Sequence, residues 1–135
     1  MTKPIYKILL FIKRNPNMSV AEFREVYETI HAPFCEKYVD GGCRYIRRYT
    51  TLVGAPHAEV SDLDFDAIAE LWFEDRANFE EIAQRVARHK LPTEVLPLEQ
   101  RMFDGAKTRV VAVVEECESD PANLGTEAKR RALGR

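Results

Sequence analysis

His31, in the segment ETIHAPF (28–34), carries a side chain suited to acid–base chemistry. Pro33 disfavours helical geometry at the residue before it, so we expect His31 near a helix end or a kink. A helix C-terminus would raise the imidazole pKa and burial beside aromatic rings would lower it. In either case the ring titrates near neutrality, where a general acid or base works. The pattern alone favours the structural alternative, a half-buried histidine that hydrogen-bonds a frayed helix carbonyl.

Glu70 and Trp72 alternate onto one face of a predicted strand, 67–74. A carboxylate beside an indole on a covered sheet would have a raised pKa and would assist proton transfer. The pattern favours a different interpretation, in which Glu70 forms an ion pair with an arginine of a neighbouring strand. The candidate arginines are Arg47, Arg48 and Arg109.

Tyr45 and Tyr49 share one face of another predicted strand, 43–53. Phenolic hydroxyls in this position would donate hydrogen bonds inside a pocket. The same rings would serve equally well at a dimer interface, and the pattern does not choose between these alternatives.

A metal site is not predicted. His31 and Cys35 are four residues apart, which would present two ligands if the helix continues past Pro33, but no third ligand is recognisable by spacing. The dinucleotide-binding, P-loop, nucleophile-elbow and zinc-protease motifs are all missing from the sequence. We therefore expect any chemistry to rely on side chains alone, without a cofactor.

The elements that must position these side chains follow from periodicity and turn residues. Ser19 with Glu22 forms a capping-box signature, and Asp75 is suited to cap a second helix. The predicted strands are 5–13, 43–53, 67–74 and 107–116, and LEQRMF (98–103) is at most a short helix. The order βαββαβ predicts an α+β, ferredoxin-like fold, an antiparallel four-stranded sheet with helices on one face. The domain is expected to span 1–117, and 118–135 to form a mobile tail or a short peripheral helix.

The first predicted helix carries an apolar stripe at helical spacing. At 100° per residue, His31 lies at the border of this stripe, neither plainly buried nor plainly solvated. The stripe consists of Val20, Phe23, Val26, Tyr27, Ile30 and Phe34.

Strands 5–13 and 107–116 are apolar on both faces. Two helices cover only one face of a four-stranded sheet, and a large exposed apolar patch is rare on a soluble monomer. The sequence therefore predicts a homodimer in which two sheets pack against each other.

The composition indicates which classes of binding partner and which cellular compartment to expect. The chain has 135 residues, 45% of them hydrophobic and 31% charged, and a formal net charge of −2. Such a balance gives no electrostatic reason to expect a nucleic acid or a membrane surface as partner. The N-terminal apolar run is short and is interpreted as a strand rather than a signal peptide. Three cysteines without a CxxC pair are typical of a reducing cytoplasm.

Several stretches in the same order resemble the EthD family of the dimeric α+β barrel superfamily. They are KILLFIKRNPNMSVAEFREVYETIHAPF, RYIRRYT, FDAIAELWFED and MFDGAKTRVVAVVEE, which cover most of residues 6 to 116. The combination of HAP after the first helix, AELWFED on a strand and a terminal VVEE is fairly specific. The resemblance implies a dimeric α+β barrel with an apolar pocket between the sheet and its helices.

The resemblance also shifts the balance for His31. This residue occupies the position of the family's HAP histidine, which implies an acid–base role. It implies that Tyr27, Tyr45, Tyr49, Glu70 and Trp72 line the pocket. Two long departures from the family pattern, the segment 84–97 and the tail after Cys117, leave the substrate open.

Three functions follow as hypotheses. The first is a cofactor-independent lyase or isomerase that transfers protons on a small cyclic carbonyl compound, such as an aromatic polyketide-like intermediate or a lactone. The second is an accessory protein that binds an apolar or aromatic intermediate without converting it. The third, haem chemistry, requires His31 or His57 as an axial ligand.

Overall fold

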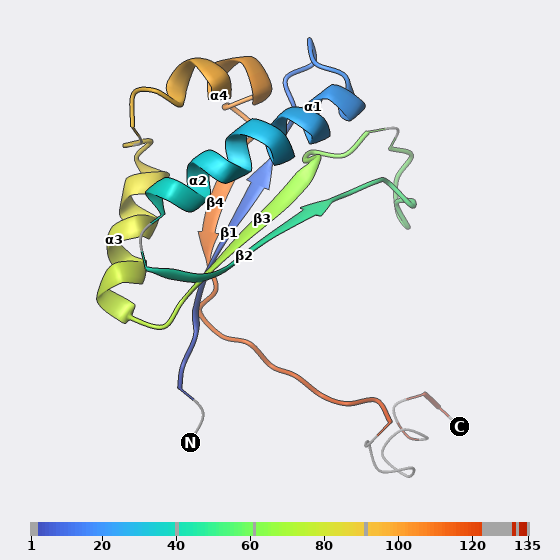
Figure 1. Cartoon of the computed structure of the whole chain (residues 1–135). Coiled ribbons are helices and arrows are strands. Elements are labelled where there is room, and N and C mark those ends of the chain that lie inside the picture. The colour runs from blue at the N-terminus through green and yellow to red at the C-terminus, as the bar shows by residue number, and fades with distance from the viewer. Residues whose placement is uncertain are drawn as a thin grey trace.

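A computed structural model gives the structure of the chain and describes residues 3–39, 41–60, 62–90, 92–122, 131, 133 and 134. Four strands and a set of helices alternate in the order expected from the sequence (Figure 1). The strands are β1 (Tyr6–Ile12), β2 (Gly42–Tyr49), β3 (Ala67–Phe73) and β4 (Arg109–Ala112). The helices are α1 (Val20–Val26), a π-helical turn η1 (Tyr27–His31), α2 (Ala32–Tyr38), α3 (Arg76–Ala87) and α4 (Leu96–Met102).

The sheet is antiparallel with the strand order β2-β3-β1-β4, which is the ferredoxin-like arrangement predicted from the βαββαβ order. Strands β2 and β4 are shorter than their predictions of 43–53 and 107–116. In β4 only residues 109–112 pair with β1 as a strand. One further hydrogen bond follows, from the Val113 N–H to the Lys7 carbonyl at 3.1 Å.

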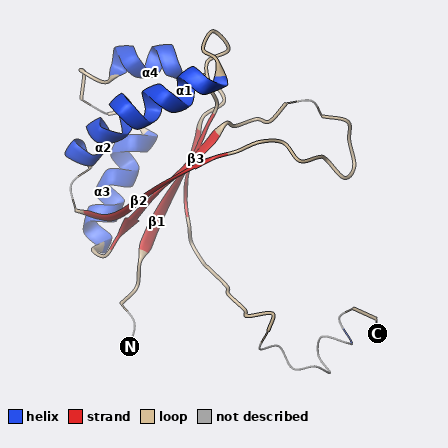
Figure 2. Ribbon diagram, turned by 45° about the vertical axis from the view of Figure 1, so that its right-hand side comes forward, coloured by secondary structure: helices blue, strands red, loops and turns tan. Residues whose placement is uncertain are grey.

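All the helices lie on one side of the sheet (Figure 2). Their side chains meet the inward residues of the strands in two adjoining clusters, one under α1 and α4 and the other under α3. Ile8, Phe23 and Phe73 are fully buried there. The alternation of apolar residues along β1 and β3 therefore places one face of the sheet in the core.

Both predicted helix starts are confirmed. The Ser19 hydroxyl accepts a hydrogen bond from the Glu22 N–H at 3.1 Å, and the Asp75 carboxylate accepts one from the Ala77 N–H at 3.0 Å. Each side chain satisfies a donor that the first helical turn leaves without a backbone partner.

The first helix does not end at Pro33. It passes through the π-helical turn η1 and continues as α2, with Ala32 in helical geometry at φ −63°, ψ −46°. A proline ring lacks an N–H and collides with the carbonyl four residues before it, and a wider turn relieves that conflict. The kink expected near His31 is therefore a π-bulge.

The π-bulge changes which residue faces the sheet. The prediction placed Ile30 in the apolar stripe and His31 at its border, and the structure reverses this: Ile30 is 50% exposed and His31 is 5% exposed. A π turn contains more residues than an α turn, so every residue after it is rotated relative to ideal 3.6-residue spacing. The extra residue turns the imidazole inward.

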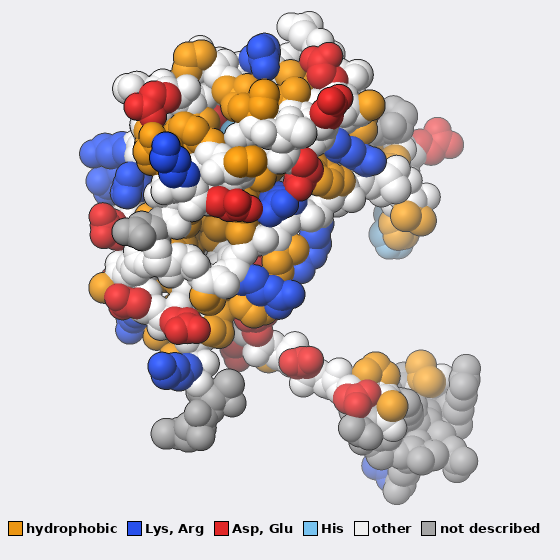
Figure 3. Space-filling view, viewed as in Figure 1, with side chains coloured by type: hydrophobic (Ala, Val, Ile, Leu, Met, Phe, Trp, Pro, Cys, Tyr) orange, Lys and Arg blue, Asp and Glu red, His pale blue; other side chains and the backbone are white. Residues whose placement is uncertain are grey.

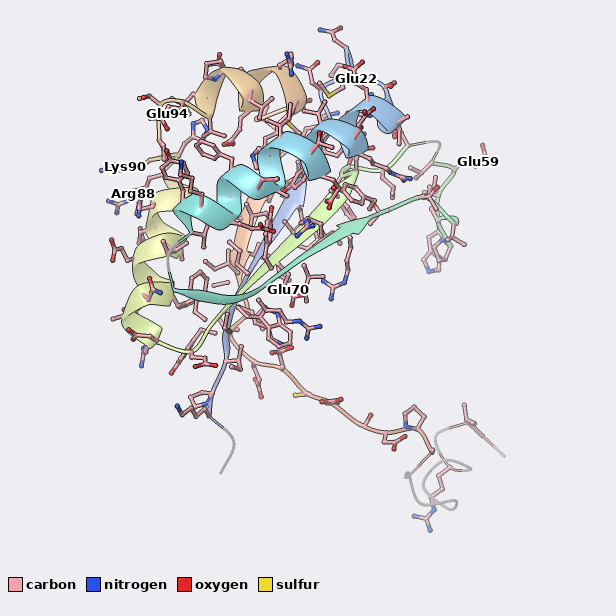
Figure 4. All side chains as sticks on the ribbon, viewed as in Figure 1. Glu22, Glu59, Glu70, Arg88, Lys90 and Glu94 are labelled. Carbon is pink, nitrogen blue, oxygen red and sulfur yellow. The ribbon has the colours of Figure 1, made fainter. Side chains whose placement is uncertain are left out.

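The face of the sheet away from the helices carries a mixture of apolar and charged side chains. Glu70 lies on this face (Figure 4) and pairs with Arg48 of β2 at 2.6 Å. The pairing predicted between Glu70 and a neighbouring-strand arginine is confirmed. The apolar members of this face, by register with Glu70 and Arg48, are Leu9, Phe11, Ile46, Ile68, Trp72 and Val111.

Beyond β4, residues 113–122 form no helix or strand. Most of the predicted tail, at 123–130, 132 and 135, lies outside the described residues.

Within the described part of the chain, none of the helices has the length and apolar character needed to cross a membrane. In the space-filling view of Figure 3, acidic and basic side chains are interspersed over the visible face.

Candidate functional site

A cavity of about 580 Å³ lies between the helices and the inward face of the sheet. Its walls are mostly apolar and come from β1, β2, β3, β4 and all the helices except α1. The polar lining residues include Arg85, His89, Gln100 and Thr108. The lining includes Leu10, Ile12, Tyr27, His31, Phe34, Cys35, Tyr38, Tyr45, Ala69, Leu71, Ile82, Val86, Val95, Glu99, Phe103 and Val110.

His31 stands in the wall of this cavity at the end of the π turn. Its ring packs between Tyr27 and Phe103, with centroid distances of 4.8 and 5.1 Å. Its Nδ1 atom is 3.4 Å from the Sγ atom of Cys35, one helical turn further on. The continuation of the helix past Pro33 is what brings the cysteine to the imidazole.

The other imidazole nitrogen faces a carboxylate. His31 Nε2 is 3.9 Å from Glu99 Oε2 of α4, and the two side chains are only 7% and 9% exposed. This distance is longer than a hydrogen bond, so the interaction is electrostatic. His31 Nε2 and Glu99 Oε1 are both buried and make no hydrogen bond with any described residue. Buried polar atoms are normally paired, so these two are available to a ligand.

Glu99 was not among the residues predicted for the site. The helix that carries it was expected to be short and was given no role. A signal was nevertheless present, because Glu99 shares helical spacing with two residues that prove to be buried, Val95 and Met102. A carboxylate in an apolar stripe needs a partner.

The environment of His31 favours the protonated ring. Burial lowers the imidazole pKa, but the Cys35 sulfur and the Glu99 carboxylate outweigh burial and raise the pKa of His31 to about 9. The ring is therefore mainly an imidazolium at neutral pH.

Tyr27 and Tyr45 bring two phenols to the same cavity. Their hydroxyl oxygens are 3.4 Å apart. Burial raises the pKa of both phenols well above the ordinary value, so both keep their protons. Each remains a potential hydrogen-bond donor to a ligand.

Tyr49 and Arg47 lie on the same face of the sheet as Tyr45, but their polar groups bind Glu28. The Arg47 guanidinium makes a two-pronged contact with the Glu28 carboxylate, at 2.9 and 2.6 Å, and the Tyr49 hydroxyl donates to the same carboxylate. The Arg47 hydrogen bonds lower the pKa of Glu28 despite its partial burial. Neither Tyr49 nor Arg47 lines the cavity.

Glu70 and Trp72 lie on the opposite face of the sheet from the cavity. Their backbone register pairs them with Leu9 and Lys7, whereas the inward residues of β3 are those on either side of them. Burial would raise the pKa of Glu70, but its hydrogen bond to Arg48 outweighs burial and lowers it. The structure thus brings together His31, Tyr27 and Tyr45 from the predicted set, and not Glu70 or Trp72.

Among the residues that the structure describes, no group of three acidic, histidine or cysteine side chains is arranged to hold a metal ion. His57, the other histidine considered as an axial ligand, lies exposed in the loop between β2 and β3.

Several solved structures resemble this fold. An EthD family protein from Bacillus halodurans has a TM-score of 0.54 and 18% identity, covering 84% of this chain and 100% of that chain. A protein from Arabidopsis thaliana has a TM-score of 0.54 and 15% identity, covering 87% and 100%. An EthD-like protein from Ralstonia eutropha has a TM-score of 0.52 and 14% identity, covering 87% and 98%. At these identities the likeness concerns the fold.

No curated protein matches the chain. The EthD domain family matches residues 15–105, which is more than half of the sequence and includes His31, Cys35, Tyr45 and Glu99. The chain belongs to the EthD family.

Proposed function

We propose that this protein is a cofactor-independent lyase or isomerase that moves protons on a small cyclic carbonyl compound. The substrate class is an aromatic polyketide-like intermediate or a lactone. The observation that carries the proposal is the buried pair of His31 and Glu99, whose free polar atoms stand in the wall of an apolar cavity.

The pair divides the work of proton transfer. With a pKa of about 9, the His31 imidazolium donates a proton or a hydrogen bond to the carbonyl oxygen of the substrate. The Glu99 carboxylate accepts the proton from the adjacent carbon. An enolate that develops between them is further stabilised by the Tyr45 hydroxyl, which keeps its proton and lines the same cavity.

The cavity matches this substrate class in size and polarity. A volume of about 580 Å³ falls within the ~300–1,000 Å³ that small-molecule sites usually occupy. Its mostly apolar walls favour a hydrophobic ring, and His31, Glu99 and Tyr45 are the polar lining groups that would orient one carbonyl. A water-poor cavity also strengthens every electrostatic interaction within it.

The test is proton exchange on a model cyclic ketone. We expect the wild-type protein in D₂O to replace the α-protons of 2-tetralone by deuterium faster than buffer does, and to isomerise α-angelica lactone to its conjugated isomer. Proton NMR follows both reactions. Wild-type protein that binds these compounds without accelerating either reaction would contradict the proposal.

That contradicting result would favour the second function, an accessory protein that holds an apolar intermediate. The same cavity supports it, because about 580 Å³ of mostly apolar volume binds a ring without chemistry. Under that function, affinity for 2-tetralone, measured by calorimetry, is largely retained when His31 is replaced by glutamine.

We also propose that the protein is a homodimer joined through the open face of the sheet. Support comes from the apolar side chains on that face, Leu9, Phe11, Ile46, Ile68, Trp72 and Val111, which the helices do not cover. A second copy would bury this surface and explain why the strands are apolar on both sides.

The expected mass in solution is twice the 15.5 kDa of one chain. Replacing Val111, which is 40% exposed, by lysine puts a charge in the proposed interface, and we expect the mass from light scattering to fall to one chain. Val20, 43% exposed on α1, is the matched control, because Val20→Lys leaves the sheet face intact. A wild-type mass of one chain would contradict the homodimer.

A further inference from the structure

Cys35, His31 and Glu99 form a line of three reactive side chains along one wall of the cavity. The Cys35 Sγ atom is 3.4 Å from His31 Nδ1, and His31 Nε2 is 3.9 Å from Glu99 Oε2. The imidazole therefore has a thiol at one nitrogen and a carboxylate at the other. This is the arrangement in which a histidine activates a nucleophile while an acid orients the histidine.

The side chains of Glu99 and His31 are both more than nine-tenths buried, at 9% and 7% exposure, and each has a polar atom without a hydrogen bond among the described residues. The thiol is half-buried and lines the same cavity. A ligand in the cavity would thus meet the sulfur and the free polar atoms together.

The other two thiols have no comparable surroundings. Cys43 and Cys117 are both exposed and do not line the cavity. The Cys117 Sγ atom is 3.9 Å from the Glu115 carboxylate. Exposure alone would make Cys43 and Cys117 the more reactive thiols, so the chain contains its own controls.

We propose that Cys35 is a nucleophile, activated by His31 and oriented through Glu99, that forms an acyl adduct with small apolar esters and lactones. This activity goes beyond proton transfer, because it makes and breaks a covalent bond to the protein.

Each step conserves atoms and charge. The Cys35 thiolate, stabilised by the His31 imidazolium, bonds to the carbonyl carbon, the bond from that carbon to the alcohol oxygen breaks, and the imidazolium protonates the departing oxygen. The neutral imidazole then takes a proton from a water molecule whose oxygen attacks the thioester. The carbon–sulfur bond breaks, and the thiolate and the imidazolium are restored. One ester and one water give one alcohol and one carboxylic acid.

The remaining cavity groups suit an acyl intermediate. The tetrahedral species carries negative charge on the former carbonyl oxygen, and the Tyr27 and Tyr45 hydroxyls are among the donors that line the cavity. Burial keeps both phenols protonated. The apolar walls select an acyl group without charge.

The experiment is a competition among the three thiols within one molecule. The full chain is treated with p-nitrophenyl butanoate, quenched in acid at successive times and digested with trypsin. The cysteines fall in separate peptides, 25–37, 38–44 and 110–129, so mass spectrometry follows each one. We expect Cys35 to be acylated at least about 100-fold faster than Cys43 and Cys117, the rate gain typical of a positioned acid or base.

The matched variants are His31→Gln and His57→Gln. We expect His31→Gln to reduce the acylation rate of Cys35 to that of the exposed thiols or below it, and His57→Gln to leave the rate unchanged. Acylation that follows exposure, with Cys43 and Cys117 ahead of Cys35 in the wild-type protein, would overturn the proposal, and this result does not depend on any variant folding. An unchanged rate in a folded His31→Gln protein would overturn it too.

The outcome is separable from the test of proton transfer. Acylation is detected as a mass on one peptide, whereas proton transfer is detected as deuterium in 2-tetralone. A protein that exchanges the ketone protons but shows no preference for Cys35 retains the proposed function and loses this inference. The opposite pair of results retains the nucleophile alone.

Discussion

His31→Gln is expected to slow deuterium exchange into 2-tetralone by at least about 100-fold, the lower end of the contribution of a positioned acid or base. Glutamine has a similar length but cannot carry a proton at neutral pH. It therefore removes the imidazolium that faces Glu99 across 3.9 Å without emptying the cavity. Initial rates of exchange at pH 7, measured by proton NMR for equal concentrations of protein, give the ratio.

His57→Gln is the matched control, since the same substitution in an exposed loop should leave the exchange rate unchanged. Glu99→Gln tests the other half of the pair and should lower the rate by a comparable factor, because an amide cannot accept the proton. Far-ultraviolet circular dichroism establishes that each variant is folded. A folded His31→Gln protein with wild-type exchange would remove His31 from the mechanism.

The dependence of this exchange on pH follows from the charge on the ring. If the imidazolium is the donor, the rate falls as pH rises through about 9, where His31 loses its proton. A neutral imidazole that acts as the base would give the opposite trend, with the rate rising through the same pH. The slope therefore tells which member of the pair gives the proton and which takes it.

Most of the fold could be predicted from local signals, because each signal has a local cause. Ser19 and Asp75 cap helices through their own backbone neighbours, and the structure confirms both. Alternation along β1 and β3 identified strands with two different faces. The ends of β2 and β4 were predicted less accurately. A strand ends where its pairing partner ends, and the local sequence does not show which residues form that partner.

The inward position of His31 could not be read from ideal helical spacing. The spacing gave a border position, and the five-residue turn Tyr27–His31 rotated the ring into the core and Ile30 out of it. Pro33 was a visible signal of irregularity, but its effect has two solutions, a helix end or a π-bulge. The choice depends on whether tertiary packing stabilises the continued helix by more than the π turn costs.

Glu70, Trp72 and Glu99 show a second limit. Alternation separates the two faces of β3 but does not indicate which face the helices cover. Glu70 and Trp72, proposed from the sequence as pocket residues, lie on the face away from the cavity. Glu99 reaches the site from α4, which meets His31 only through tertiary packing. A lone carboxylate in an apolar helical stripe is the signal that points to such a residue.

The free energy of unfolding should depend on pH through the protonation of His31. The pKa of His31 is raised from 6.5 to about 9 on folding, so the folded state binds this proton more tightly than the unfolded state. The resulting stabilisation is fully present below the unfolded pKa, declines as pH rises, and is lost once pH passes about 9. The shift corresponds to a loss on the order of 3 kcal/mol in the free energy of unfolding across this window.

Urea unfolding of the wild-type protein and of His31→Gln, at intervals from pH 6 to pH 10, isolates this contribution, because other groups that titrate in the range are common to both proteins. We expect the stability advantage of the wild type over His31→Gln to shrink steadily with rising pH. A difference that does not change with pH would mean that His31 has the same pKa in both states. The ring would then be neutral beside Glu99 at pH 7, and the imidazole would have to act as the base rather than the donor.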